Sequence, residues 1–175
     1  MHPPDLFHHC PKCGLPAKPS GKAPFHCATC GFLFYFNPAI AVGAILQAPD
    51  GRILLVRRAK QPHLGKLTVP GGFVDILETA EDALRREIRE EVSLHIARLD
   101  YFCSLPNDYH FQGVTYQVLD FFFIGQAPHL DARPDPGEVA EICWLHHTEI
   151  DLEQIAFPSV RRALEQFIAG VRLKS

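Results

Sequence analysis

The sequence lacks the features that would place the protein in a membrane. No apolar run approaches the roughly 20 residues that a membrane-spanning helix needs. The first ten residues, MHPPDLFHHC, contain neither the basic segment nor the apolar stretch of a secretory signal. We therefore expect a soluble, cytoplasmic protein with no membrane partner.

Basic charge is also scarce. The net charge is −3, and residues 1–36 contain three lysines and no arginine. A surface that binds the backbone of a nucleic acid needs clustered lysine and arginine. The composition therefore argues against a nucleic-acid partner.

Two Cys-x-x-Cys pairs stand near the start of the chain, Cys10–Cys13 and Cys27–Cys30. A glycine follows each pair, and this suits a tight turn around a metal ion. Four thiolates at such spacing are typical of a closed, tetrahedral Zn²⁺ site with a structural role. Disulfides are the alternative, and a cytoplasmic location disfavours them. We predict a small zinc ribbon at residues 1–36 and a main domain at residues 37–175.

An aromatic run, Phe32–Phe36, ends the predicted ribbon, and Asn37-Pro38 marks the boundary. A module this small needs an apolar contact, so we expect the run to pack the ribbon onto the main domain. Stacking on a nucleobase is the alternative.

The main domain is predicted to contain strands and two main helices. Strand-like patterns cover residues 39–47, 52–58, 67–70, 96–105, 114–125 and 141–145. Helical patterns cover residues 80–92 and 159–169, and Gly170 is expected to end the second helix. Residues 106–113, PNDYHFQG, are predicted to form an aromatic-rich loop. This content predicts a mixed sheet between helices, an α/β sandwich.

The first helix carries the most informative charges. Glu87, Glu90 and Glu91 are spaced i, i+3 and i+4, so their side chains are neighbours on one side of the helix. Glu87 and Glu91 share a face with residues that must be buried, which a solvated charged face does not explain. Buried carboxylates need positive compensation. A hard divalent cation, Mg²⁺ or Mn²⁺, is the natural choice.

The stretch that contains this helix resembles the Nudix box. Five residues separate Gly72 from Glu78, and seven separate Glu78 from Arg86-Glu87-Ile88. Glu90-Glu91 and Leu94 complete the match. One position departs, because Ser93 stands where the family has a glycine that takes the left-handed conformation at the helix end. The resemblance implies a Nudix-type α/β/α sandwich and hydrolysis of a nucleoside diphosphate linked to another group.

The resemblance extends over most of the chain. A Cys-x-x-Cys ribbon joined to a Nudix domain is similar to bacterial NADH pyrophosphatases and plant FAD pyrophosphatases. The stretches PHLGKLTVPGGFV, GEVAEICWL and IAFPSV resemble the second group. The SQPWPFPxS signature of the NADH enzymes is absent, and the downstream proline typical of ADP-ribose pyrophosphatases is not matched. We expect cleavage of FAD, ADP-ribose or NADH with release of AMP.

The expected roles divide into catalysis and binding. Arg86 is expected to orient Glu78 or Glu90, although a solvated arginine would fit equally well. The general base is a box glutamate or one of two loop residues, Glu138 and Glu141. Further candidates for substrate contact are the following: Arg57 and Arg58 at a strand end, the backbone of Gly71 and Gly72, and the rings of Tyr109, Phe111, His110, Tyr116 and Phe73.

Two other function classes compete with this one. A hydrolase of oxidised nucleoside triphosphates would release pyrophosphate and a mononucleotide. A non-catalytic nucleotide sensor or zinc-ribbon nucleic-acid module is expected to lose box glutamates, and none is lost here. The exact substrate, the number of catalytic metals and the oligomeric state stay open, and a homodimer is the candidate assembly.

Overall fold

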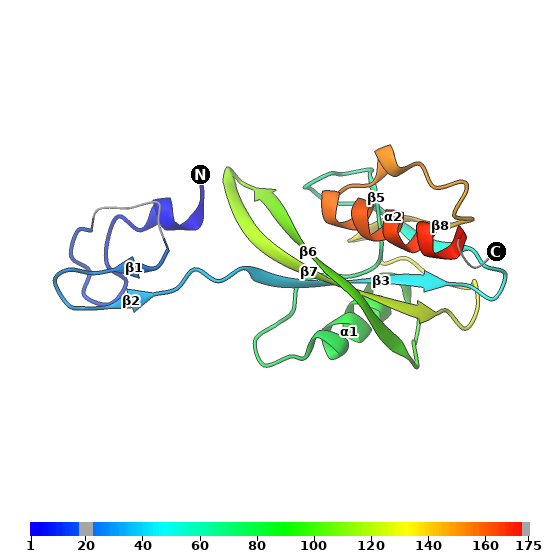
Figure 1. Ribbon diagram of the computed structural model, residues 1–175, viewed down its shortest axis with the longest axis horizontal. Helices are drawn as coiled ribbons and strands as arrows, with labels where there is room; N and C mark the ends of the chain where they lie inside the picture. Colours follow the sequence, from blue (N-terminus) through cyan, green and yellow to red (C-terminus); the bar gives the residue numbers. More distant parts are fainter. Residues whose placement is uncertain (18–22, 173–175) are drawn as a thin grey trace. The chain divides into compact units, whose positions relative to one another are not determined.

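The computed structural model describes residues 1–17 and 23–172. The chain divides into two compact units (Figure 1). The first contains residues 1–39 and 108–118, and the second contains residues 40–107 and 119–175. In the described part of the chain, no helix is both long and apolar enough to cross a membrane.

The first unit contains the cysteine ribbon. Its regular elements are the 3₁₀-helix η1 (Pro3–Leu6) and two short strands, β1 (Phe25–His26) and β2 (Leu33–Phe34), which pair antiparallel. The rings of the aromatic run pack on one another and on two further phenylalanines. These contacts involve Phe7, Phe25, Phe32, Phe34 and Phe36. The run therefore supplies an apolar centre for the ribbon itself.

The second unit is built on a six-stranded sheet. The strands of the sheet are β3 (Ala39–Gln47), β4 (Ile53–Arg58), β5 (Leu67–Thr68), β6 (Leu99–Phe111), β7 (Val114–Gln126) and β8 (Val139–Leu145). The adjoining ends of β6 and β7, residues 108–118, belong to the first unit. The strands lie in the order β5-β4-β3-β7-β6, and β8 pairs with β4. Helix α1 (Ala80–Val92) lies on one face, and α2 (Pro158–Arg172) lies on the other (Figure 1). A second 3₁₀-helix, η2 (Leu152–Gln154), precedes α2.

Each face of the sheet has its own apolar core. Leu84, Ile88 and Val92 of α1 pack against Leu54 and Val56 on one side. Leu164 and Phe167 of α2 pack on the other face against Ile45, Leu55 and Phe122. The predicted α/β/α sandwich is therefore confirmed.

Strand pairing in the sheet fixes the position of the double glycine, Gly71-Gly72. The whole length of β4 pairs with β8, while its other edge pairs with β3 at Ile53 and with β5 near its end. The segment after β5 pairs with β3. Ala44 N donates to Pro70 O at 2.9 Å, and Val42 N donates to Gly72 O at 2.8 Å. This pairing holds Gly71 and Gly72 against the middle of the sheet.

Three predictions about these elements are wrong. Residues 106–111 belong to β6, so the predicted loop is reduced to a turn at Gln112-Gly113. Pro106 is tolerated there because β6 is an edge strand of the sheet, where a missing N–H leaves no ladder bond unmade. Strand β6 also begins at Leu99 and not at Ile96.

Gly170 does not end the last helix, which continues to Arg172. A glycine in a helix costs only about 1 kcal/mol relative to alanine. Val171 packs against the apolar core on this face of the sheet. That burial favours continuing the helix past the glycine.

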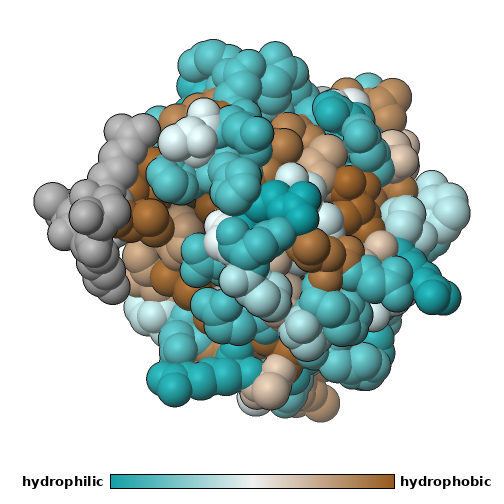
Figure 2. All heavy atoms as spheres, turned by 90° about the vertical axis from the view of Figure 1, so that its right-hand side faces the viewer, coloured by the Kyte–Doolittle hydropathy of each residue, from teal (hydrophilic) through white to brown (hydrophobic). Residues whose placement is uncertain are grey.

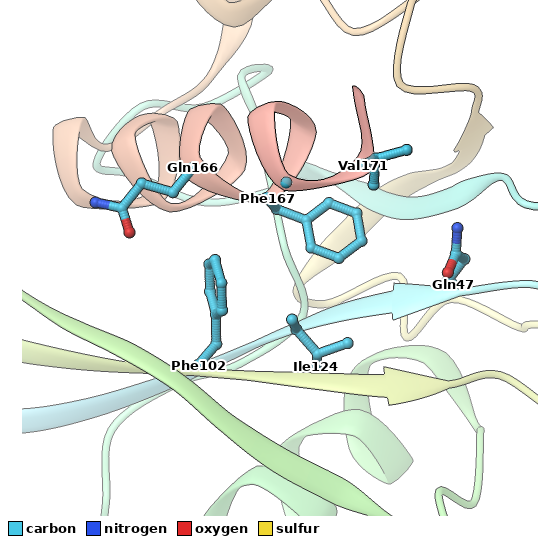
Figure 3. Close-up of a pocket in the computed structure, with 7 residues that line it drawn as sticks. Gln47, Phe102, Ile124, Gln166, Phe167 and Val171 are labelled. Atoms are coloured by element: carbon cyan, nitrogen blue, oxygen red, sulfur yellow. The ribbon is translucent and has the colours of Figure 1, made fainter. Parts of the chain in front are cut away.

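The surface view in Figure 2 shows the face that lies at the right of Figure 1. Hydrophilic residues cover most of it, and apolar residues lie between them in small groups. A cavity of about 510 Å³ lies between α2 and the sheet, with Phe102, Ile124 and Phe167 in its wall (Figure 3). It lies on the face opposite α1, and the described residues that line it are uncharged.

Candidate active site

Helix α1 places the box glutamates. Thr79 caps its first turn by accepting a hydrogen bond from Asp82 N at 3.2 Å, as predicted. Ser93 ends the helix in the left-handed conformation, with φ 56° and ψ 30°. The serine therefore takes the conformation that the family glycine would take, and the helix ends at the expected residue.

Glu91 is the most buried of the box carboxylates, with 9% of its surface exposed. It lies on the same face of α1 as Leu84 and Ile88. Gly71 N donates a hydrogen bond to Glu91 Oε2 at 2.9 Å. Burial nevertheless raises the pKa of Glu91 to about 8, and the negative charges of Glu87 and Glu138 add to the rise. The carboxylate therefore lies where positive compensation would stabilise it.

The double glycine allows the sheet to approach α1 closely. Gly71 has φ 147°, and a Cβ at this residue would collide with the carbonyl of Val42. A Cβ at Gly72 would collide with the carboxylate of Glu87. Only glycine therefore leaves room for Glu87 beside the sheet. The backbone of this segment borders the carboxylates of Glu87 and Glu91, while its role beside a metal ion stays a prediction.

Arg86 binds several of these carboxylates. Its Nε and Nη2 donate to the two oxygens of Glu78 at 3.0 and 2.9 Å, which is a bidentate pair. Its Nη1 donates to Glu87 Oε1 at 2.8 Å and to Glu90 Oε2 at 3.3 Å. Nη2 also reaches the carbonyl of Phe73 at 3.1 Å. Arg86 is therefore not a solvated side chain, which was the alternative that the sequence left open.

These contacts act on the pKa of Glu78 and of Glu87. The guanidinium of Arg86 lowers the pKa of Glu78. Burial raises the pKa of Glu87, and the hydrogen bond from Arg86 opposes that rise. Glu78 also accepts from Asp75 N at 3.2 Å, so the loop before α1 is tied to the same arginine.

The two loop glutamates have different surroundings. Glu141 accepts a 2.7 Å hydrogen bond from Arg57 Nε. Glu138 accepts from Lys60 Nζ at 2.6 Å and lies close enough to raise the pKa of both Glu87 and Glu91. The segment before Glu138 follows the end of α1, since Asp135 N donates to Glu91 O at 3.0 Å. Of the two candidates for the base, Glu138 is thus the one beside the box carboxylates.

The two arginines at the end of β4 also differ. Arg57 is bound to Glu141 and to Gly65 O, the latter at 3.0 Å. Arg58 donates to Pro62 O at 2.8 Å, and its charge lowers the pKa of Glu91. The pairing of β4 with β8 shifts between these two residues. Such irregularities are common beside active sites, where they redirect side chains.

The aromatic candidates are distributed between the two units. Tyr109, Phe111 and Tyr116 belong to the first unit, where the rings of Tyr109 and Phe111 lie 6.3 Å apart. Phe73 belongs to the second unit and is 41% exposed. Stacking of these rings on a substrate stays a prediction.

Two residues that the sequence did not single out contact the predicted ones. Lys60 binds Glu138, and Phe157 lies against Arg58, with the guanidinium carbon 5.0 Å from the ring centre. Phe157 lies in the stretch IAFPSV, which resembles the FAD pyrophosphatases, but the resemblance assigned it no role. No sequence pattern pointed to Lys60.

The four cysteines form a separate site. Their sulfur atoms all lie within 4.8 Å of one another, with Cys10–Cys30 at 3.7 Å and Cys13–Cys27 at 3.9 Å. A tetrahedral site with Zn–S bonds of about 2.3 Å has sulfurs about 3.8 Å apart. Gly14 and Gly31 both have φ 71°, and each donates to the carbonyl of the first cysteine of its pair. Two matching turns therefore surround the metal position of a zinc ribbon.

A protein-family comparison matches residues 37–167 to the NUDIX domain. The chain belongs to the NUDIX family. It is 33% identical over 171 residues to the NAD-capped RNA hydrolase NudC of Deinococcus radiodurans, and the match covers 94% of this chain and 58% of NudC. A shorter match, 44% over 63 residues, relates it to the ADP-ribose pyrophosphatase of Methanocaldococcus jannaschii, with 36% of this chain and 37% of that protein covered.

Solved structures agree with this assignment. A NUDIX hydrolase from Nitrosomonas europaea has a TM-score of 0.72 at 26% identity, with 92% of this chain and 90% of that chain covered. A MutT NUDIX hydrolase from Burkholderia pseudomallei has a TM-score of 0.63 at 30% identity, with 74% and 98% covered. The solved structures therefore support the same family, and the chain spans 58% of the length of the NudC relative.

Nudix enzymes use divalent cations, and the residues on α1 fit such an ion. Carboxylate oxygens are the ligands that Mg²⁺ and Mn²⁺ prefer. Among the described residues, however, only the four cysteines bring three or more ligand groups within 4.8 Å of one another. Arg86 holds Glu87 and Glu90, whereas Gly71 holds Glu91. Binding a cation through all three glutamates therefore requires their carboxylates to move closer together.

Proposed function

We propose that this Nudix hydrolase cleaves the diphosphate of an ADP-linked dinucleotide and releases AMP, with FAD as the preferred candidate and ADP-ribose and NADH as the others. The observation that carries the proposal is the buried carboxylate of Glu91, whose pKa is raised to about 8 by burial and by the negative charges of Glu87 and Glu138. Such a concentration of negative charge is costly unless a cation is bound.

Glu87, Glu90 and Glu91 would hold Mg²⁺ or Mn²⁺, which when bound neutralises the charge of a diphosphate and lowers the pKa of a water molecule. Arg86 keeps Glu78 and Glu87 in place through its hydrogen bonds. Gly71 fixes one oxygen of Glu91. These contacts hold the carboxylates on one side of the helix, and binding of the cation would bring them closer together.

Glu138 is the proposed general base. Its carboxylate would accept the proton of the attacking water, and its nearness to Glu87 and Glu91 supports this role. Glu141 is paired with Arg57 as Glu138 is paired with Lys60, so the choice rests on the effect of Glu138 on Glu87 and Glu91. We assign the binding of a diphosphate oxygen to Arg58, because its positive charge acts on Glu91.

The relatives support an ADP-linked substrate. One is named for NAD-capped RNA and the other for ADP-ribose, and both NAD and ADP-ribose contain adenosine diphosphate. FAD shares this half, and the sequence stretches that resemble FAD pyrophosphatases favour it within the group. The four-cysteine ribbon would hold one Zn²⁺ and contribute to stability, because it has no open coordination position.

NAD-capped RNA is a second candidate substrate. The match to NudC covers 94% of this chain, including its ribbon. This finding qualifies the expectation that nucleic acid is no partner. Hydrolysis of NAD-capped RNA faster than of free NAD⁺ would favour this candidate over a free dinucleotide.

A substrate screen tests the proposal. Purified protein is incubated with FAD, NADH, NAD⁺, ADP-ribose, coenzyme A and deoxynucleoside triphosphates, with Mg²⁺ and with Mn²⁺. AMP from a dinucleotide is the expected product. Turnover of an oxidised triphosphate alone, with release of pyrophosphate, would identify a housecleaning hydrolase instead.

A further inference from the structure

Phe157, which immediately precedes α2, connects the α2 face of the sheet to the active site. The guanidinium carbon of Arg58 lies 5.0 Å from the centre of its ring. The ring of His63 meets the same ring edge-on, with the centroids 5.1 Å apart. A cation within about 6 Å of an aromatic face is attracted to it. The arginine is therefore held by a residue that lies far from it in the sequence.

The chain fixes Phe157 from both sides. Ile155 pairs with Leu67 of β5 in a parallel bridge, and Ala156 N donates to Leu67 O at 2.8 Å. After Phe157 the chain enters α2, where Arg161 N donates to Phe157 O at 3.0 Å. The ring itself packs against the apolar core beneath α2. Phe157 is thus rigidly placed, as a supporting residue must be.

Arg58 is held at two further points. Its side chain donates from Nε to Pro62 O at 2.8 Å. Its backbone N donates to Lys66 O at 3.0 Å. A long arginine side chain loses rotamer entropy when it is ordered. The contacts with Pro62 and Phe157 order it before a ligand binds, and its charge acts on Glu91.

We propose that Phe157 is a positioning residue of the active site, whose ring holds the guanidinium of Arg58 in the orientation that binds the diphosphate of the substrate. The inference rests on the proposed function, in which Arg58 contacts that diphosphate. Phe157 touches no reacting atom. It acts by reducing the entropy that Arg58 loses on binding.

Steady-state kinetics test the proposal with three variants. Phe157→Leu removes the aromatic face but keeps an apolar side chain. We expect kcat/KM to fall about tenfold, mainly through a higher KM, and Phe157→Trp to restore most of it. Phe102→Leu is the matched control, because Phe102 is also a partly buried ring against the α2 core but lies in the wall of the cavity (Figure 3). It should lower the melting temperature without raising KM.

A double-mutant cycle separates positioning from a general effect on the fold. In an Arg58→Met background, Phe157→Leu should cause no further loss of kcat/KM, since the arginine on which it acts is gone. An equal loss in both backgrounds overturns the proposal, as does a KM unchanged by Phe157→Leu. Phe157→Met replaces Phe157→Leu in the same cycle should the leucine variant not fold.

Binding of inorganic pyrophosphate, measured by calorimetry with Mg²⁺, gives a readout that does not depend on the substrate. Phe157→Leu should weaken this binding about tenfold, while Phe102→Leu leaves it unchanged. Equal affinity in the wild type and Phe157→Leu overturns the role of Phe157, and so does a wild type that does not bind pyrophosphate. Lack of hydrolysis of every dinucleotide, with pyrophosphate binding intact and sensitive to Phe157, overturns only the proposed function.

Discussion

The backbone amide of Gly71 donates a 2.9 Å hydrogen bond to the carboxylate of Glu91. This contact joins the sheet to the buried face of α1 at the point where a carboxylate is most costly. One amide does not compensate the buried charge, since the pKa of Glu91 is still raised to about 8. A bound cation would compensate the charge that the amide leaves uncompensated.

Replacing Glu91 should separate catalysis from stability. Glu91→Gln keeps the shape of the side chain and removes one carboxylate charge. We predict that turnover falls by about 10²-fold or more. In metal-free buffer near pH 8, the melting temperature should rise by about 5 °C or more, because the variant no longer buries a charge. Unchanged activity at saturating Mg²⁺ would show that Glu91 is not a ligand.

The same variant should change how stability depends on pH. The ordinary pKa of a glutamate is 4.5, and that of Glu91 in the folded protein is about 8. As the pH rises between these values, the unfolded chain releases its proton before the folded chain does, so the metal-free protein becomes less stable. Melting curves in EDTA from pH 5 to 8 should show this loss in the wild type and a smaller loss in Glu91→Gln. Glu90→Gln is the control, because it removes the same charge from a side chain that is 56% exposed. An equal slope in Glu91→Gln and the wild type would contradict the assignment.

Gly72→Ala should disturb the site without unfolding the protein. The added Cβ would collide with the carboxylate of Glu87, so that carboxylate must move away from the sheet. We predict a loss of about tenfold or more in kcat, because a displaced carboxylate no longer holds its place in the site. Gly170→Ala is the matched control, since its Cβ would meet no atom of the described residues within 4 Å. It should leave kcat unchanged and slightly raise stability. Full activity in Gly72→Ala would mean that Glu87 has no fixed role.

Glu138→Gln and Glu141→Gln form a pair that tests the general base. Both substitutions remove one charge near the start of β8 and preserve size. We predict that Glu138→Gln lowers kcat about 10²-fold and that Glu141→Gln changes it less than threefold. The pH dependence of kcat should lose its acidic limb only in Glu138→Gln. A larger effect from Glu141→Gln would reverse the assignment.

The ribbon is predicted to hold one Zn²⁺ per chain. Elemental analysis of protein prepared without chelator should find this stoichiometry. Cys13→Ser should lower the melting temperature and leave kcat of the folded fraction unchanged, because all four ligands are protein thiolates. Absence of zinc, or strong loss of turnover in fully folded Cys13→Ser, would contradict this role.

Much of the α1 site could be predicted from the sequence because its determinants are local. Thr79, the glutamates and Ser93 lie within about four turns of one helix, where spacing alone fixes which side chains are neighbours. The cysteine pairs are local in the same sense.

What could not be predicted depends on contacts between distant segments. Glu138 and Glu141 look alike in the sequence, and only the course of the chain past the end of α1 brings Glu138 near Glu91. The pairing of Phe157 with Arg58 depends on the bridge between Ile155 and Leu67. Residues 106–111 looked like a loop because of Pro106, whose effect on a strand depends on whether the strand lies at an edge of the sheet.

The most direct test of the account is kcat/KM for FAD, NADH and ADP-ribose, measured side by side in Mg²⁺, in Mn²⁺ and in EDTA, with product analysis. The account predicts AMP as a product, activity that depends on the metal, and FAD at least equal to the other two. NADH preferred over FAD by tenfold, a difference of about 1.4 kcal/mol in transition-state binding, would contradict the choice of FAD. Background rates for all three dinucleotides, with turnover of an oxidised deoxynucleoside triphosphate, would contradict the central claim.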